Sequence, residues 1–158
     1  MKYNFKKISV SILGLVLILF SSCALLIHVD SPKPTDPNVQ VNGYSMDAAG
    51  HYIIKIIFNY AINTSTVIST KTLILKFSKD ANTNAAITWS PDSKTATVTT
   101  IKTRDDLNIF QPDDHFSLTL IGTDAGNGVI KSTGGYVLDG DYDNTGGGDY
   151  VIGFTIIG

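Results

Sequence analysis

The sequence predicts an all-β protein, an antiparallel β-sandwich of about seven strands, and three observations support this. Apolar and polar residues alternate with a period of two in segments such as 95–101 and 116–121, which is the pattern of half-buried strands. All 14 acidic residues are aspartates, so glutamate, a strong helix former, is absent. Threonine is abundant, and 14 glycines supply turns. A helical bundle is therefore excluded.

Length, cysteine content and charge exclude several other classes. The chain has 158 residues, of which 43% are hydrophobic, and this suits a leader followed by one domain with one core. The single cysteine, Cys23, excludes an internal disulfide and any site built from several cysteines. The formal net charge is −2, and it becomes −5 once a leader carrying Lys2, Lys6 and Lys7 is removed. That sign is wrong for binding phosphates, so nucleic acid is not expected as a partner.

Residues 1–22 have the composition of an export signal peptide. A positively charged end is followed by an uncharged apolar segment over residues 8–20, which is expected to form a signal helix, and then by two serines and Cys23. The order Phe20-Ser21-Ser22-Cys23 resembles the lipobox of bacterial lipoproteins. The resemblance implies a covalent diacylglyceryl lipid on Cys23 and cleavage before it. A membrane anchor fits this chemistry, because a thiol is the most nucleophilic side chain available for alkylation.

Two other interpretations of the leader remain open. Apolar residues continue past Cys23, so residues 8–29 are also long enough, at about 20 residues, to cross a bilayer as an uncleaved helix. Plain secretion after cleavage is the third interpretation. All three place the rest of the chain outside the cytoplasm, and the lipobox adds attachment to the outer membrane or the cell surface. Residues 23–37 hold three of the five prolines near their end and are expected to form a lipidated tether.

Residues 38–158 are expected to form the sandwich. The predicted strands, in order, are 39–41, 52–58, 73–77, 87–89, 95–101, 116–121 and 150–157. The turn residues 90–94 predict a hairpin between the fourth and fifth of these strands. A short helical turn is expected at residues 63–67, where Asn63 is a suitable cap. Seven short strands in a domain of this size are typical of an Ig-like sandwich.

Several segments carry a family resemblance. They are 58–67, the strand 73–77, the hairpin 89–98, the strand 114–120 and the turn Asp124-Ala125-Gly126-Asn127-Gly128. Together they resemble the bacterial Ig-like domain of the SbsA type over most of residues 39–157. The resemblance implies a non-catalytic module of a surface or S-layer protein, used for adhesion, envelope structure or partner binding.

The segment 138–150 is the strongest candidate for a metal site. Asp139, Asp141, Asp143 and Asp149 alternate there with glycines, and calcium binds six to eight oxygen ligands. The segment does not match the helix-loop-helix calcium motif, because Asn144 stands where glycine is required and Tyr150 stands where glutamate belongs. Two interpretations therefore stay open, a calcium site and a mobile acidic loop that protects a sheet edge.

Two further groups are candidates for chemistry or binding. The pair Asp113-Asp114 followed by His115 could serve acid–base catalysis in a small hydrolase, although loop residues beside a strand are the simpler interpretation, as for Asp105-Asp106. His51 is expected to be a solvated edge residue. Exposed tyrosines could contact a protein or carbohydrate ligand, Tyr136 and Tyr142 above all, whereas Trp89, Phe116 and Phe154 are expected to fill the core.

Overall fold

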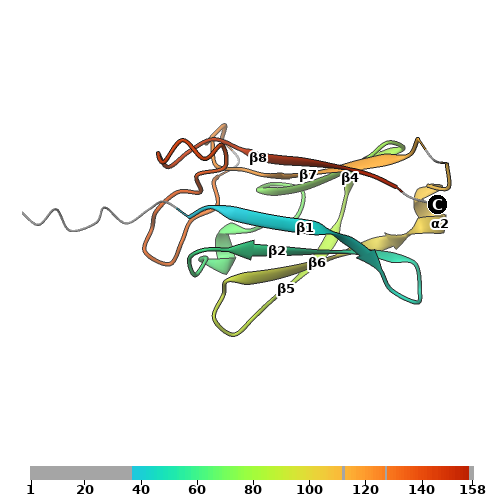
Figure 1. The fold of residues 1–158 in the computed structure, drawn as a ribbon, viewed down its shortest axis with the longest axis horizontal. Coiled ribbons are helices and arrows are strands. Elements are labelled where there is room, and N and C mark those ends of the chain that lie inside the picture. The colour runs from blue at the N-terminus through green and yellow to red at the C-terminus, as the bar shows by residue number, and fades with distance from the viewer. Residues whose placement is uncertain (1–36, 112, 127, 157–158) are drawn as a thin grey trace, which may run out of the picture. The chain divides into compact units, whose positions relative to one another are not determined.

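The computed structural model describes residues 37–156 except 112 and 127, and this part of the chain forms two antiparallel sheets (Figure 1). One sheet has four strands in the order β1-β2-β6-β5, and the other has four in the order β4-β3-β7-β8. An Ig-like sandwich has the same order, in which strands A, B, E and D face strands C, F and G. Here β4 is an additional strand beside β3, in the place of strand C′. The predicted all-β sandwich is confirmed.

In the described part of the chain, turns and two short helices join the eight strands. The strands are β1 (Val39–Met46), β2 (His51–Phe58), β3 (Leu73–Phe77), β4 (Asp80–Thr83), β5 (Ala85–Trp89), β6 (Thr95–Thr103), β7 (His115–Leu120) and β8 (Tyr150–Thr155). The helices are η1 (Thr64–Thr66) and α2 (Arg104–Leu107). The predicted signal peptide 1–22, Cys23 and the tether up to residue 36 lie outside the described residues. Within residues 37–156, apart from the two gaps, no helix is long and apolar enough to cross a membrane.

Local sequence explains the parts of the fold that were predicted. Strand β5 pairs with β6 in the expected hairpin, with Trp89 opposite Ala96. Asp92 closes its turn by accepting a hydrogen bond from the Lys94 N–H at 3.1 Å. The Asn63 side chain caps η1 by accepting from the Ser65 N–H at 3.3 Å, as predicted.

Strand β4 and helix α2 were not predicted. Strand β4 has only four residues, Asp-Ala-Asn-Thr, and three of them are not buried, so no apolar alternation marks it. Helix α2 begins with a reciprocal capping box, in which Thr103 and Asp106 each bond the other's backbone N–H. The prediction that Asp105-Asp106 is a plain loop terminus was therefore wrong, because Asp106 lies in the first turn of a helix.

The core lies between the two sheets and is centred on Phe116. This side chain is fully buried, and the rings of four residues surround it with centroid distances from 4.8 to 5.7 Å: Tyr44, Tyr52, Phe77 and Phe154. Trp89 packs against the edge of the core, where it stacks on Phe58 at 6.0 Å. The prediction that Trp89, Phe116 and Phe154 belong to the core is confirmed, with Phe116 alone of the three completely enclosed.

An extra residue in β1 directs Tyr44 into this core. Val41 pairs with Ile56 and Tyr44 pairs with Ile54, so three steps along β1 match two steps along β2. Gly43 occupies the resulting bulge with a φ of 104°, which is accessible to glycine. Since side chains alternate between the two faces of a strand, without the bulge Tyr44 would point away from the core that Val41 faces.

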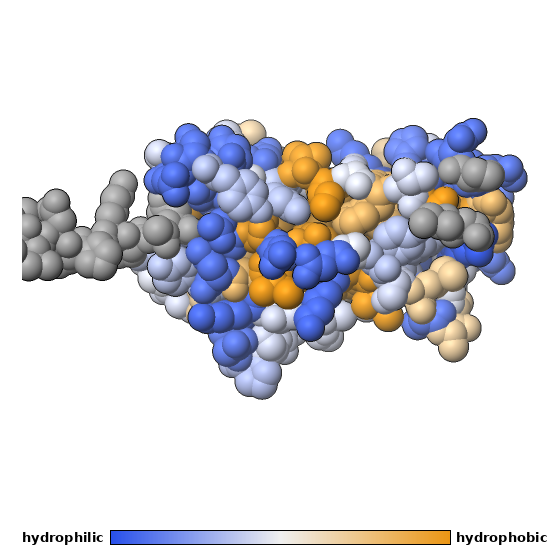
Figure 2. All heavy atoms as spheres, in the orientation of Figure 1, coloured by the Kyte–Doolittle hydropathy of each residue, from blue (hydrophilic) through white to orange (hydrophobic). Residues whose placement is uncertain are grey.

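Strand β1 at one edge of its sheet and strand β8 at one edge of the other lie at the front in Figure 1. On this side of the molecule, hydrophobic residues gather in the middle of the surface and hydrophilic residues surround them (Figure 2). The Tyr44 hydroxyl crosses from β1 to β8, where it donates a hydrogen bond to the Thr155 carbonyl at 3.2 Å. This hydrogen bond joins the two sheets along the side formed by β1 and β8.

Candidate functional site

The acidic, glycine-rich loop, residues 138–149, folds back on itself immediately before β8. Leu138 is fully buried, and its carbonyl accepts a hydrogen bond from the Gly147 N–H at 2.9 Å. The Gly140 N–H donates to the Gly147 carbonyl at 3.1 Å. The Asp139 N–H donates to the Pro37 carbonyl at 2.8 Å, which fastens the loop to the segment leading into β1. Backbone hydrogen bonds thus hold the acidic loop against one end of the sandwich.

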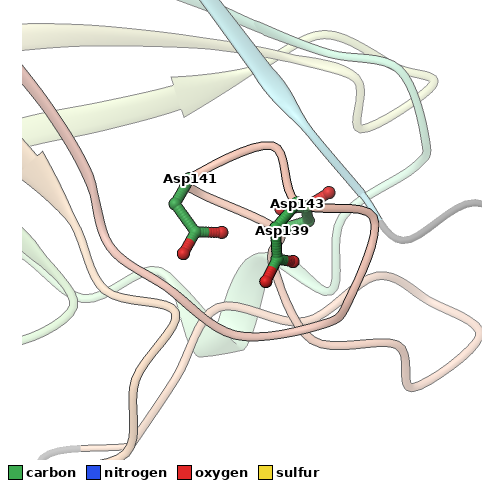
Figure 3. A group of neighbouring side chains, drawn as sticks. All are labelled: Asp139, Asp141 and Asp143. Carbon is green, nitrogen blue, oxygen red and sulfur yellow. The ribbon is translucent and has the colours of Figure 1, made fainter.

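Three of the four predicted carboxylates converge within this loop. Asp139, Asp141 and Asp143 each provide one oxygen that lies within 4.8 Å of the other two. Figure 3 shows the three side chains, with Asp139 and Asp143 overlapping in this view and Asp141 beside them. Ligand atoms around one calcium ion, at about 2.3–2.6 Å from it, are at most about 5 Å apart. The spacing of the three oxygens is therefore compatible with a single cation.

Burial distinguishes Asp139 from the other two. Asp141 and Asp143 are exposed to solvent, whereas Asp139 is only 3% exposed. Its Oδ2 accepts a hydrogen bond from the Asn144 N–H at 3.1 Å. Its Oδ1 is buried and has no hydrogen-bond partner among the described residues. A buried polar oxygen without a partner is unfavourable, because it has lost its hydration without compensation.

Gly148 makes room for the Asp141 carboxylate. Its φ is 69°, and a Cβ at this position would lie 2.5–2.6 Å from the carboxyl carbon and oxygens of Asp141. No real Cβ approaches other atoms so closely, so any residue other than glycine would displace that carboxylate or the backbone. The glycine at position 148 therefore allows the Asp141 carboxylate to lie close to the backbone just before β8.

Asp149, the fourth predicted ligand, has a different role. Its Oδ1 accepts hydrogen bonds from the Gly122 N–H at 3.0 Å and the Thr123 N–H at 2.9 Å. These bonds link the chain just after β7 to the chain just before β8. Asp149 therefore joins two strand ends and does not belong to the group of three carboxylates.

The two tyrosines selected from the sequence also differ from each other. The Tyr142 hydroxyl donates a hydrogen bond to the Val39 carbonyl, and its ring packs edge-on against Tyr150 at 6.2 Å. Burial raises the pKa of Tyr142, and the nearby groups of Tyr150 and Asp139 raise it further. The Tyr142 side chain thus attaches the acidic loop to β1. Tyr136 is 44% exposed and stays a candidate for contact with a ligand.

Asp114 is a structural anchor at the opposite end of the sandwich. The side chain is almost completely buried, and its Oδ2 accepts from the N–H groups of Phe110 and Gln111, both at 2.9 Å. Ser78 and Lys79 donate to the same carboxylate at 3.0 and 3.1 Å. The Gln111 N–H and the other donors lower the pKa of Asp114 to about 2. Its neighbours Asp113 and His115 are exposed, so the three groups do not enclose a common site.

His51 differs from the prediction of a solvated residue. It is the first residue of β2, and its Nδ1 lies 2.9 Å from Oδ2 of Asp47 with about a quarter of its side chain exposed. The Asp47 carboxylate also accepts from the His51 N–H at 2.9 Å and caps the turn before β2. These hydrogen bonds, first that from the backbone of His51, lower the pKa of Asp47.

The similarity of this chain to known proteins is weak. No family model matches the chain, and no curated protein matches it. Among solved structures, the chain is similar to the N-terminal part of the bacterial S-layer protein SbsC, with a TM-score of 0.46 and 16% identity. The similarity covers 76% of this chain and 24% of that structure, so the chain spans about a quarter of its length.

Proposed function

We propose that this chain is an extracytoplasmic lipoprotein whose Ig-like sandwich is a non-catalytic module, held at the bacterial cell envelope by a lipid on Cys23. The observation that carries the proposal is the order of residues at the start of the chain. Basic residues, an apolar stretch, two serines and a cysteine follow one another directly, and a proline-rich segment precedes the domain. The single cysteine thus stands at the position where lipid attachment requires a thiol.

The roles of the acidic residues favour binding or support over catalysis. Asp114 is ionised down to about pH 2 and is held by four donors, so it is poorly suited to exchange protons near neutral pH. Asp106 caps a helix and Asp149 joins two strand ends. Of the aspartate pairs considered for acid–base catalysis, Asp114 and Asp106 thus make hydrogen bonds that support the fold.

The proposed mechanism is presentation of a rigid surface. Acyl chains hold the membrane, the proline-rich tether sets the distance, and the loops and edge strands contact a protein or carbohydrate ligand. Adhesion, envelope structure and partner binding all use this arrangement. Tyr136, exposed in a glycine-rich segment, is a residue through which such contact would occur.

Lipid labelling tests the proposal. Cells producing the full chain are given a radioactive fatty acid, and the labelled band is compared between the natural sequence, Cys23→Ala and the control variant Ser45→Ala on the domain surface. We expect label and a mature-sized product for the natural sequence and the control, and neither for Cys23→Ala. Label that persists in Cys23→Ala, or an unlabelled, full-length natural product in the membrane, contradicts the lipoprotein and favours the uncleaved anchor.

A further inference from the structure

The acidic loop gathers negative charge, and no basic side chain among the described residues forms an ion pair with it. One carboxylate oxygen each of Asp139, Asp141 and Asp143 lies within 4.8 Å of the other two. The lysines that pair with aspartates in the described part of the chain bind Asp80 and Asp114 instead. Carboxylates at this separation repel, and the repulsion is stronger where one of them is removed from water. A bound cation would remove this repulsion.

Asp139 provides an independent observation that points to a ligand. Its side chain is 97% buried, yet Oδ1 has no hydrogen-bond partner within the described part of the chain, while Oδ2 is used by the Asn144 N–H. The same carboxylate belongs to the group of three. A buried carboxylate with one unpartnered oxygen, facing two further carboxylates, is the arrangement expected of a metal ligand.

We propose that Asp139, Asp141 and Asp143 hold one calcium ion. The ligand atoms are all carboxylate oxygens, which suit a hard cation. The group contains neither the sulfur nor the nitrogen ligands that zinc prefers. Calcium also tolerates irregular geometry, with water completing its shell, whereas magnesium requires a nearly ideal octahedron. Asp149 is not a ligand in this proposal, because its Oδ1 is bound to the Gly122 and Thr123 N–H groups.

The position of the loop gives the ion a structural role. The backbone of Asp139 is bonded to Pro37, and the Tyr142 hydroxyl is bonded to Val39. An ion held by Asp139, Asp141 and Asp143 therefore also strengthens the attachment of the loop to the start of β1. Because only the native state assembles the three carboxylates, calcium stabilises folding as its concentration exceeds the dissociation constant.

Calcium titration of the full-length protein, purified in detergent and freed of metal by a chelator, tests the proposal. Thermal unfolding is followed by near-ultraviolet circular dichroism, and binding is followed by calorimetry. We expect one ion per chain and a rise in the unfolding midpoint of roughly 10 °C at a hundredfold excess over the dissociation constant. An unmoved midpoint without heat of binding at millimolar calcium overturns the proposal, and an equal response to magnesium overturns the assignment to calcium.

Matched variants locate the ion. Asp139→Asn keeps an oxygen for the Asn144 N–H, and Asp141→Asn and Asp143→Asn change exposed residues, so all three are expected to fold and to lose the calcium response. Asp113→Asn, at the other end of the sandwich, and Asp149→Asn each remove the same charge. Both variants are expected to keep the calcium response. A normal calcium response in all three loop variants, or loss of the response in Asp113→Asn, contradicts the assigned site.

The calcium proposal is independent of the lipid on Cys23, so either proposal can fail while the other stands.

A luminescence measurement gives a second readout of the same site. Terbium replaces calcium in oxygen sites and emits when an adjacent tyrosine is excited, and Tyr142 lies between two of the proposed ligands in the sequence. We expect emission from the natural protein that added calcium displaces and that Asp141→Asn abolishes. Emission that calcium does not displace contradicts a shared site.

Discussion

The Tyr44 hydroxyl donates a hydrogen bond to the Thr155 carbonyl at 3.2 Å and so connects the edge strands of two different sheets. The residues are 111 positions apart in the sequence, and the Gly43 bulge is what turns Tyr44 toward the core. Its ring meets Phe116 edge-on at 5.1 Å. Tyr44 therefore combines core packing with a polar contact that closes the side of the sandwich between β1 and β8.

Removing the Tyr44 hydroxyl or ring tests this double role. We expect Tyr44→Phe to lower the free energy of unfolding by about 0.5–1.5 kcal/mol, the usual value of one hydrogen bond. Tyr44→Ala is expected to cost about 3–5 kcal/mol, because it also leaves a cavity beside Phe116. Urea unfolding measures both, with Tyr136→Phe as the control at an exposed tyrosine. If Tyr44→Ala is no more destabilising than the control, the ring does not support the core.

The bulge itself is tested by comparing two glycines. Gly43→Ala introduces a Cβ at a φ of 104°, and we expect a loss of about 1–3 kcal/mol of stability from backbone strain alone, because no atom lies within 4 Å of that Cβ. Gly153 in β8 has equally open surroundings but no positive φ. Gly153→Ala is therefore expected to be neutral or slightly stabilising. Equal urea midpoints for the two variants would argue against the bulge.

Asp114 is expected to make stability depend on pH in acid. Its folded pKa is about 2, below the ordinary value of 3.8, so the unfolded chain takes up the proton at a higher pH than the folded chain. The stabilisation is complete above about pH 5 and is lost as the pH falls from about 4 toward 2. We expect Asp114→Asn to be less stable at pH 7 and to lose stability less steeply over that window. Thermal unfolding of both proteins from pH 2 to 7 measures this pH dependence of stability.

The neighbouring exposed acid provides the control for that experiment. Asp113→Asn removes the same charge one residue away without touching the donors Phe110, Gln111 and Lys79. It is expected to keep the steep loss of stability below pH 4. If Asp113→Asn flattens the pH profile as much as Asp114→Asn does, net charge and not the anchored carboxylate is responsible.

Asp149 is expected to contribute stability through two backbone hydrogen bonds. Asp149→Ala leaves the Gly122 and Thr123 N–H groups to solvent, and we expect a loss of about 1 kcal/mol in urea unfolding. Asp149→Asn retains a side-chain oxygen and is expected to unfold close to the natural protein. Faster amide hydrogen exchange at Gly122 and Thr123 in Asp149→Ala, with no change in Asp149→Asn, identifies the bonds. Unchanged exchange in both variants would show that the bonds contribute nothing.

Most strands could be predicted because burial imposes a period of two on the residues that form them. Strand β2 buries Tyr52, Ile54, Ile56 and Phe58, and the same regularity marks β6 and β7. Strand β4 escaped prediction because it is a polar edge strand that is defined by its pairing to β3 and not by an apolar face. The β1 bulge was not predicted either, because the predicted strand ended at Val41, before Gly43.

The residue types of the candidate site could be predicted from the sequence, but not which of the four aspartates come together. Four aspartates in a glycine-rich segment are visible in the sequence, and three of them do converge. The way the loop folds back decides which three aspartates converge. Backbone hydrogen bonds of Gly147 with Leu138 and Gly140 hold this fold. Asp149 lies two residues past Gly147, where the chain already turns into β8 and faces the end of β7 instead. Asp114 shows the same limit, because its four donors come from two separate segments.

The sequence by itself determined the all-β class, the hairpin at residues 90–94 and the cap at Asn63, and it shows a lone cysteine after an apolar segment. The structural features follow from alternation and turn preferences, which act between residues close in the chain. The tertiary structure decided the burial of Asp139, the separate role of Asp149 and the contact of Tyr44 with Thr155. Each of these depends on groups that folding alone brings together, and on the loss of water around them, which no local pattern records.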